Sequence, residues 1–236
     1  MISKKLDYTV IIIAVAIFLI LQLPYFTHIQ YPFRLLGTWF HEMGHGLTTL
    51  LVGGKFNYLE IYSNGGGVAN ITVSGKLLSI SLARAFTSAG GLLGPAIAGS
   101  LLIIAARSQK NAGILLRILT LVMLLSLIMW IRSFWGSVVL SGFVILFTAI
   151  MLLKNKKIVT ITVLFLGLQC ILSTYYQLNY LFTKQFERNG QIMISDTQNI
   201  AINTFGTYWL WGFVLLLVSF FMLWKSLRYY LKSYNY

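Results

Sequence analysis

Five consecutive residues of this chain, 41–45, could bind a metal ion and activate water. They read His41-Glu42-Met43-Gly44-His45, which is the pattern H-E-x-x-H. On a helix, positions i and i+4 lie on the same face, so both imidazoles can reach one metal ion. Glu42 is adjacent to His41 and can reach a water on that metal. The spacing is typical of zinc sites in which the glutamate acts as a general base.

The motif lies in an apolar stretch of a chain that has few ionisable residues. Of 236 residues, 58% are hydrophobic and 10% are charged, with three His and five acidic residues. A lone His or Glu in hydrocarbon costs on the order of a few kcal/mol unless it is paired or bound. Three polar groups on neighbouring turns therefore need a shared partner, and a metal ion is one such partner.

The composition, with a mean hydropathy of +0.79, indicates an integral membrane protein. The net charge of +13 does not indicate nucleic-acid binding, because the basic residues flank apolar segments and suit anionic lipid headgroups. The single cysteine, Cys170, excludes an internal disulfide and a cysteine-rich zinc finger. The basic groups are Arg107/Lys110, Lys154/Lys156/Lys157 and Lys225/Arg228/Lys232.

Seven apolar stretches are long enough to cross a membrane as helices. We therefore expect an α-helical polytopic membrane protein of about seven spans. Only residues 132–135 separate the fourth and fifth stretches, which predicts a tight helical hairpin. Lys and Arg are nearly balanced on alternate sides, so the orientation stays open. The expected spans are 8–27, 33–53, 80–106, 112–131, 136–153, 158–182 and 205–224.

We expect one membrane-embedded domain over residues 1–236. Lys4 and Lys5 precede an apolar run that is long, ends at Pro24 and has no A-x-A site after it, so we interpret it as a retained anchor and not a cleaved signal. The expected parts are an anchor helix (1–30), the motif helix with a hairpin and a Gly-rich helix (33–106), additional spans (107–183), and a segment with the last span and a basic tail (184–236).

Residues 54–79 interrupt the apolar pattern after the motif. Residues 56–63 and 68–74 are rich in Tyr, Ile, Val and Thr, and Asn64-Gly65-Gly66-Gly67 separates them. This pattern predicts a small β-hairpin. Because hydrocarbon does not tolerate unpaired strand edges, we expect the hairpin in a cavity or at the interface. Further along, residues 89–99 carry small side chains at helical spacing, which predicts a surface for close helix packing.

Two imidazoles do not complete a catalytic zinc site, which uses three protein ligands and a water. We expect His28 in a short interfacial loop before the motif helix and Glu60 in the hairpin. Glu187 lies beside basic residues in an expected polar loop, where solvation explains it. Asp7 sits at the N-terminal membrane edge. All four therefore have ordinary expected surroundings.

Asp196 differs from these candidates because it lies in a partly apolar segment just before the last expected span. Its polar neighbours Gln198, Asn199 and Asn203 indicate a functional group. However, Ser195 or Asp196 could merely cap a following helix. The residues alone leave both interpretations open.

These features together resemble the site-2 protease class of intramembrane zinc metallopeptidases, and within it the compact bacterial branch without a PDZ domain. The matching segments are 41–45, 64–67, 89–95 and 195–197, and the resemblance runs from about residue 35 to 212. In that family an aspartate in a later core helix is the third zinc ligand, often in an Asp-Gly pair. Here Thr197 follows Asp196, which departs from the pattern. The resemblance still implies Asp196 as the third ligand, ahead of Glu187.

The resemblance implies a zinc metalloendopeptidase of the bacterial inner membrane, with one catalytic Zn²⁺ held by His41, His45 and Asp196. Glu42 would be the general base. The implied partners are a membrane-anchored protein substrate and the lipid bilayer, with no nucleic acid.

A transmembrane substrate must unwind before its peptide bonds can be reached, so a strand edge near the zinc could hold it as an added strand. The turn could instead be merely flexible. Asn199 could steady an oxyanion or orient Asp196, or make an ordinary interhelical hydrogen bond. The expected substrate-binding residues are Asn64, Gly65, Gly66, Gly67 and Asn199.

Two other kinds of function are open. A protease homologue without activity could bind membrane partners, although the presence of His41, Glu42 and His45 argues against it. A metal or ion transporter could use intramembrane His and Asp residues as a pathway. Transporters often contain internal repeats, and this sequence has none.

Overall fold

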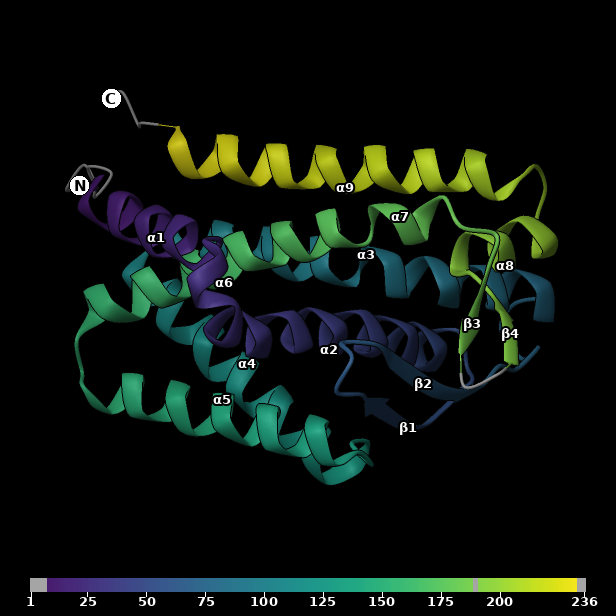
Figure 1. Ribbon diagram of the computed structural model, residues 1–236, viewed down its shortest axis with the longest axis horizontal. Helices are drawn as coiled ribbons and strands as arrows, with labels where there is room; N and C mark the ends of the chain where they lie inside the picture. The colour runs from purple at the N-terminus through teal and green to yellow at the C-terminus, as the bar shows by residue number, and fades with distance from the viewer. Residues whose placement is uncertain (1–7, 189–190, 233–236) are drawn as a thin grey trace.

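The structure is a computed structural model that describes residues 8–188 and 191–232, and these form a mostly helical bundle (Figure 1). The candidates Asp7, Lys4 and Lys5 lie outside the described residues. The helical elements are α1 (Tyr8–Leu21), the 3-10 turn η1 (Pro24–Phe26), α2 (Thr27–Leu51), α3 (Ile80–Ala106), α4 (Gln109–Met129), α5 (Phe134–Leu152), α6 (Lys156–Tyr176), α7 (Leu178–Leu181), α8 (Asp196–Asn203) and α9 (Tyr208–Leu231). The strands are β1 (Lys55–Ile61), β2 (Gly67–Thr72), β3 (Gln185–Arg188) and β4 (Gln191–Ile194).

A long helix forms at each of the seven apolar stretches, which confirms their assignment as helices. Within the described residues, four helices are long and apolar enough to cross a membrane, namely α3, α4, α5 and α9. A fifth candidate arises if α1 and the chain from Pro24 to Leu51 are counted as one bent span. The chain is therefore an integral membrane protein by length and composition, with four or five candidate spans where about seven were expected.

Proline explains the sharp break between the first two helices. Pro24 has no amide hydrogen, and Leu23 before it takes an extended conformation with ψ of 143°. The axis turns by 86° over this break. Helix α2 then starts at once, and the Thr27 hydroxyl donates a hydrogen bond to the Pro24 carbonyl at 2.6 Å. His28 consequently lies in the first turn of α2, which corrects the expected loop.

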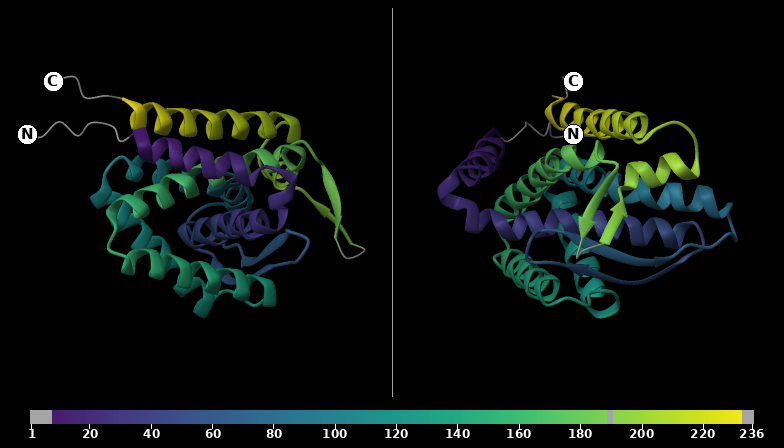
Figure 2. Two further views of the ribbon diagram at one scale, coloured as in Figure 1. Left: turned by 60° about the vertical axis from the view of Figure 1, so that its left-hand side comes forward. Right: turned by 45° about the vertical axis from the view of Figure 1, so that its right-hand side comes forward.

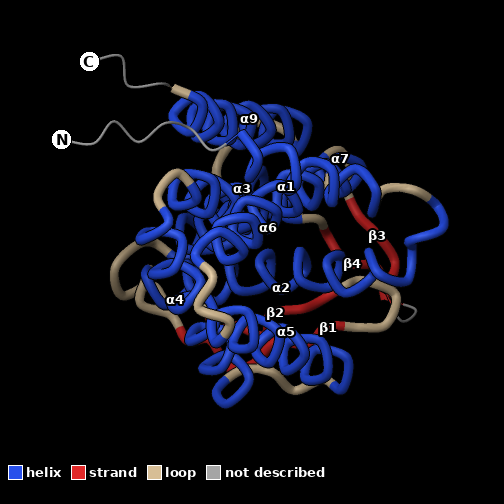
Figure 3. The backbone as a smooth tube through the Cα atoms, turned by 90° about the vertical axis from the view of Figure 1, so that its left-hand side faces the viewer, coloured by secondary structure: helices blue, strands red, loops and turns tan. Residues whose placement is uncertain are grey.

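Helix α3 lies at the centre of the bundle and contacts α2, α6, α8 and α9. Helix α9 lies along one side of the molecule, and α4 and α5 lie along the opposite side (Figures 2 and 3). The helix bearing the motif is thus placed between α3 and the hairpin, where its polar face can be enclosed by protein. Trp39, on the opposite face, is buried and donates to Ser126 of α4 at 3.0 Å.

Glycines let α2 and α3 approach closely, which confirms the predicted packing surface. A Cβ at Gly44 would overlap the backbone carbonyl of Gly90, and one at Gly94 would overlap the carbonyl of Phe40. On the other side of α3, a Cβ at Gly99 would lie 2.8 Å from the Cβ of Cys170 on α6. Small residues therefore set the spacing of α3 from both neighbours.

The predicted hairpin is confirmed as the antiparallel pair β1–β2, with Lys55 opposite Thr72 and Ile61 opposite Gly67. Protein covers the outer edge of β1, where the α4–α5 connection runs beside it. The Leu59 amide donates to the Trp130 carbonyl at 2.8 Å, and the Arg132 amide donates to the Leu59 carbonyl at 3.0 Å. Among the described residues, no strand pairs with the outer edge of β2.

A second antiparallel hairpin, β3–β4, was not expected. Glu187 lies in β3, opposite Ile192, and not in a polar loop. The strands have four residues each and little alternation, so their sequence resembles a loop. Packing explains the ordering in part, because the Phe186 ring lies edge-on to Tyr180 with centroids 5.5 Å apart.

Candidate metal centre

The two motif histidines converge on one point beside α3. Their Nε2 atoms are 3.0 Å apart, and the ring centroids are 4.6 Å apart. His45 Nδ1 lies 2.9 Å from the Thr87 carbonyl oxygen. Because a carbonyl only accepts, Nδ1 is the donor, and this leaves the Nε2 lone pair available to a metal ion.

A glycine on α3 makes room for the second imidazole. A Cβ at Gly91 would overlap the ring of His45 at its Nε2 and Cε1 atoms. The Gly-rich stretch therefore serves the site as well as the helix packing. Any larger residue at this position would displace the ring that faces the metal group.

Asp196 reaches the histidines from the start of α8. Its Oδ2 lies 3.3 Å from Nε2 of both His41 and His45. The sequence left two roles open for this segment, a helix cap and a functional carboxylate, and the structure shows each role on a different residue. Ser195 is the N-cap, and its Oγ accepts from the Gln198 amide at 3.2 Å. Asp196, the first residue of the helix, turns its carboxylate to the imidazoles.

Tyr180 of α7 holds Asp196 in this position. The Tyr180 hydroxyl donates to Asp196 Oδ2 at 3.1 Å and accepts from the Asp196 amide at 3.2 Å. Burial by itself raises the pKa of Asp196, but the adjacent imidazoles of His45 and His41 outweigh it and hold that pKa well below its usual range.

The three side chains fit a zinc ion in donor type and in spacing. Their ligand atoms all lie within 4.8 Å of one another, and within the described ranges His41, His45 and Asp196 are the group that meets this condition. Tetrahedral ligands at about 2.0–2.1 Å from zinc are about 3.3 Å from each other. The observed separations of 3.0, 3.3 and 3.3 Å match this value. The group could thus hold a metal ion.

Glu42 lies beside the group and under the first hairpin. It is buried, and it lines the same cavity of about 550 Å³ as the three candidate ligands. A Cβ at Gly67, the first residue of β2, would lie 2.8 Å from Glu42 Cγ and 2.9 Å from Oε1. A side chain at position 67 would therefore require Glu42 to move, whereas glycine lets β2 begin directly over this carboxylate.

The hairpin turn is fixed to α2 by three side chains. Tyr31, Arg34 and Thr38 donate to the carbonyls of residues 63, 64 and 65, at 2.7, 3.2 and 2.6 Å. Gly65 has a φ of +90°, which favours glycine. Of the expected substrate-binding residues, Gly65, Gly66 and Gly67 line the cavity, whereas Asn64 does not. Its Oδ1 instead accepts from the Gly66 amide at 2.9 Å.

Asn199 also lines the cavity, but its amide is engaged elsewhere. Its Nδ2 donates to Ser88 of α3 at 2.7 Å, and its Oδ1 accepts from Asn203 at 3.0 Å. The geometry is that of the interhelical hydrogen bond, the simpler of the two expected interpretations.

The remaining third-ligand candidates are elsewhere: Glu60 accepts from Tyr62 at 2.8 Å, and Glu187 is exposed on β3.

Sequence reasoning missed Tyr180, Thr87 and the β3–β4 hairpin. Tyr180 lies within an apolar stretch, where nothing distinguishes it from an interfacial tyrosine. Thr87 acts through its backbone carbonyl, which carries no sequence signal. The hairpin contributes Phe186, Met193 and Ile194 to the cavity wall.

Fold and site together define a class: integral membrane proteins whose helices enclose a group able to hold a metal ion, beside a buried glutamate. A family model described as Peptidase M50B-like matches residues 10–226. The chain therefore belongs to this family, which is the site-2 protease family, and the resemblance noted from the sequence is confirmed. No curated protein and no solved structure matches the chain.

Proposed function

We propose that the protein is an intramembrane zinc metalloprotease that hydrolyses peptide bonds of membrane-anchored proteins. The main support for the proposal is that Asp196 Oδ2 lies 3.3 Å from Nε2 of both His41 and His45, and that Glu42 lines the same cavity. Family membership supports a peptidase, and the donor set supports zinc. A bound zinc ion would acidify a water molecule and polarise the scissile carbonyl.

The residues of the chain supply the proton handling and the orientation. Glu42 is the general base that takes a proton from the water and delivers it to the leaving amine. The Thr87 carbonyl fixes the tautomer of His45, and the Tyr180 hydroxyl fixes the carboxylate of Asp196. These contacts hold the ligands in place before substrate arrives, so little reorganisation is needed.

The substrate pairs with the outer edge of β2. Gly67, Val68 and Ala69 line the cavity beside Glu42, and β1 already has its own outer edge covered. An unwound substrate segment that adds to β2 as a strand would expose its peptide bonds and satisfy its backbone hydrogen bonds. Gly67 places the start of this edge closest to the general base.

The proposal extends to the whole chain in the membrane. All seven long helices, including α6 with its 21 residues, lie in the bilayer around one site, and the chain forms a single membrane-embedded domain. The membrane is the bacterial inner membrane, as for the compact branch of the family.

A Glu42→Gln variant tests the proposal against a homologue that only binds partners or a transporter. Purified wild type should cleave a model transmembrane peptide and hold about one zinc per chain. Glu42→Gln should keep its zinc but lose cleavage by about 10²-fold or more, the usual contribution of a general base. Glu60→Gln, the same change outside the cavity, should behave as wild type. Full cleavage by Glu42→Gln would refute the mechanism, and metal flux in liposomes that depends on His41 but not on Glu42 would favour transport.

A further inference from the structure

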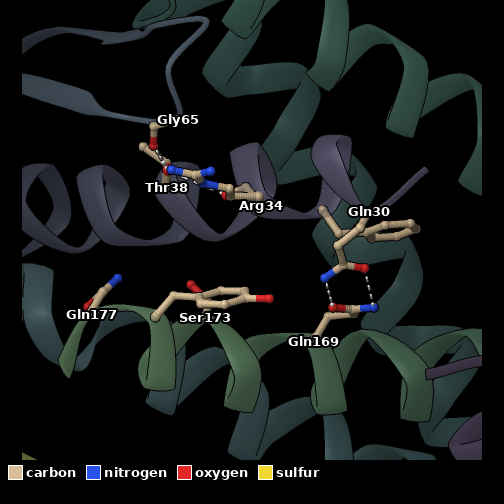
Figure 4. A pocket seen from close by; sticks show the side chains of 9 residues that line it. Gln30, Arg34, Thr38, Gly65, Gln169, Ser173 and Gln177 are labelled. Carbon is tan, nitrogen blue, oxygen red and sulfur yellow. Dashed lines mark hydrogen bonds between the residues drawn. The ribbon is translucent and has the colours of Figure 1, made fainter. Parts of the chain in front are cut away.

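A second cavity of about 150 Å³ lies beside the first, between α2 and α6, and we name it the side pocket (Figure 4). It shares Arg34, Thr38, Gly65, Tyr176 and Gln177 with the main cavity, so the two cavities adjoin. Gln30, Arg34 and Thr38 face it from α2, and Gln169, Ser173 and Gln177 face it from the opposite side.

The side pocket lies on the same face of α2 as the metal ligands. Residues 30, 34 and 38 follow one another at intervals of four, and His41 and His45 continue the row. Arg34 is seven residues before His41, which corresponds to about 10.5 Å along a helix axis. An extended peptide advances about 3.3 Å per residue, so this distance is about three residues of a substrate strand.

The wall of the side pocket is polar and carries one positive charge. Its lining residues comprise amides, hydroxyls, two aromatic rings, a glycine and the guanidinium of Arg34, with no carboxylate. The amides of Gln30 and Gln169 pair with each other, at 3.1 and 3.3 Å. In the part of the chain that the structure describes, Arg34 has no ion pair, and its side chain donates a hydrogen bond from Nη2 to the Asn64 carbonyl at 3.2 Å. Arg34 is exposed, and a guanidinium has five N–H donors, so most of them face water and can turn to another acceptor.

Anchoring of the hairpin turn does not account for this charge. Tyr31 and Thr38 hold the neighbouring carbonyls with shorter bonds, and both are neutral. A cation facing a pocket of neutral polar groups is matched best by a carboxylate, which it can bind through two parallel hydrogen bonds.

We propose that the side pocket is a specificity subsite that binds an acidic side chain of the substrate through Arg34, about three residues from the scissile bond. The inference rests on the proposed protease function and adds a substrate class to it. An acidic residue enters between α2 and α6 while the flanking backbone lies along β2. Substrates with Glu or Asp at that distance are therefore preferred over those with Gln, Asn or Lys.

The test is a set of model transmembrane peptides in which one Glu, or Gln as its neutral match, is moved over positions one to five on each side of the cleaved bond. The measured quantity is the ratio of kcat/KM for the Glu peptide to that for the Gln peptide. Wild type should show a ratio of about tenfold or more at one position near the third residue, the size of one charge-assisted hydrogen bond. Arg34→Gln should bring this ratio close to one, and Arg34→Glu should prefer Lys. Arg34→Lys should keep a preference for Glu that is weaker than in wild type, because an ammonium group cannot form the two parallel bonds. Tyr31→Phe, which loses another turn anchor but no charge, should keep the wild-type ratio.

Binding separates failure of the subsite from failure of the protease. The same labelled peptides are titrated by fluorescence anisotropy against Glu42→Gln protein, with and without Arg34→Gln. A preference for Glu that needs Arg34 supports the subsite even where no peptide is cleaved. Cleavage without any preference, or a preference that survives Arg34→Gln in folded protein, overturns it. A preference confined to peptides ending in a free carboxylate, and lost on amidation, overturns the assignment to a side chain.

Discussion

At the scale of single residues, the site depends on contacts made by side chains outside the motif. His45 is oriented by a backbone carbonyl and Asp196 by a tyrosine hydroxyl. Outer contacts of this kind typically change metal affinity by about 10–100-fold when they are removed. The H-E-x-x-H pattern therefore identifies only part of what holds the metal.

We predict that Tyr180→Phe weakens zinc binding by about tenfold or more. The variant loses both hydrogen bonds to Asp196, at 3.1 and 3.2 Å, so the carboxylate is freer to rotate away from the imidazoles. Zinc affinity is measured by competition with a chelator of known affinity. Tyr25→Phe removes a hydroxyl from a residue that is 92% exposed and should leave affinity unchanged. Equal zinc affinities of wild type and Tyr180→Phe would show that Tyr180 does not position Asp196 for metal binding.

At the scale of elements, the site depends on the close approach of the α2 and α3 backbones. Gly44 and Gly90 bring the two backbones together, and Thr87 then reaches His45. The first hairpin is also fixed by its neighbours. Helix α2 binds the hairpin turn, and the α4–α5 connection binds the outer edge of β1. Each of these elements is fixed by contacts from segments far away in sequence.

We predict that Gly44→Ala destabilises the protein by about 1–3 kcal/mol, because the new Cβ meets the Gly90 carbonyl, which cannot move aside easily. The measurement is thermal unfolding in detergent. Gly142→Ala is the matched control, since a Cβ there meets nothing within 4 Å. That control should be neutral or slightly stabilising, because alanine favours a helix over glycine. A Gly44→Ala protein as stable as Gly142→Ala would mean that α2 and α3 are farther apart than described.

At the scale of the whole molecule, the structure removes a conflict in the distribution of charge. Counting basic residues on alternate sides gave no clear orientation, because each apolar stretch was taken as one crossing. The start of α1, the α5–α6 connection and the end of α9 all lie at one end of the molecule, and the hairpins lie at the other (Figure 1). The 86° bend between α1 and α2 means that these two helices are not two ordinary crossings.

Features with a local cause could be predicted from the sequence, and features with a tertiary cause could not. Runs of apolar residues predicted the seven helices, and Asn64-Gly65-Gly66-Gly67 predicted the first hairpin. The bend at Pro24 makes α1 and α2 at most one candidate span, and α6 is not among the candidates, so fewer spans result than hydropathy along the sequence indicated. Asp196 and His41 are 155 positions apart in the chain, so the residues alone left the role of Asp196 open and the family resemblance favoured it as a ligand. Tyr180 and the β3–β4 hairpin had no distinctive pattern at all.

The most direct test of the account is the zinc content of purified Asp196→Asn protein beside wild type and Glu187→Gln, after equilibration with a limiting buffered concentration of free zinc. An amide in place of the carboxylate removes the one anionic ligand, so affinity should fall steeply. We expect about one zinc per chain in wild type and in Glu187→Gln, and less than about a tenth of that in Asp196→Asn. Full zinc occupancy in folded Asp196→Asn protein would contradict the proposed centre.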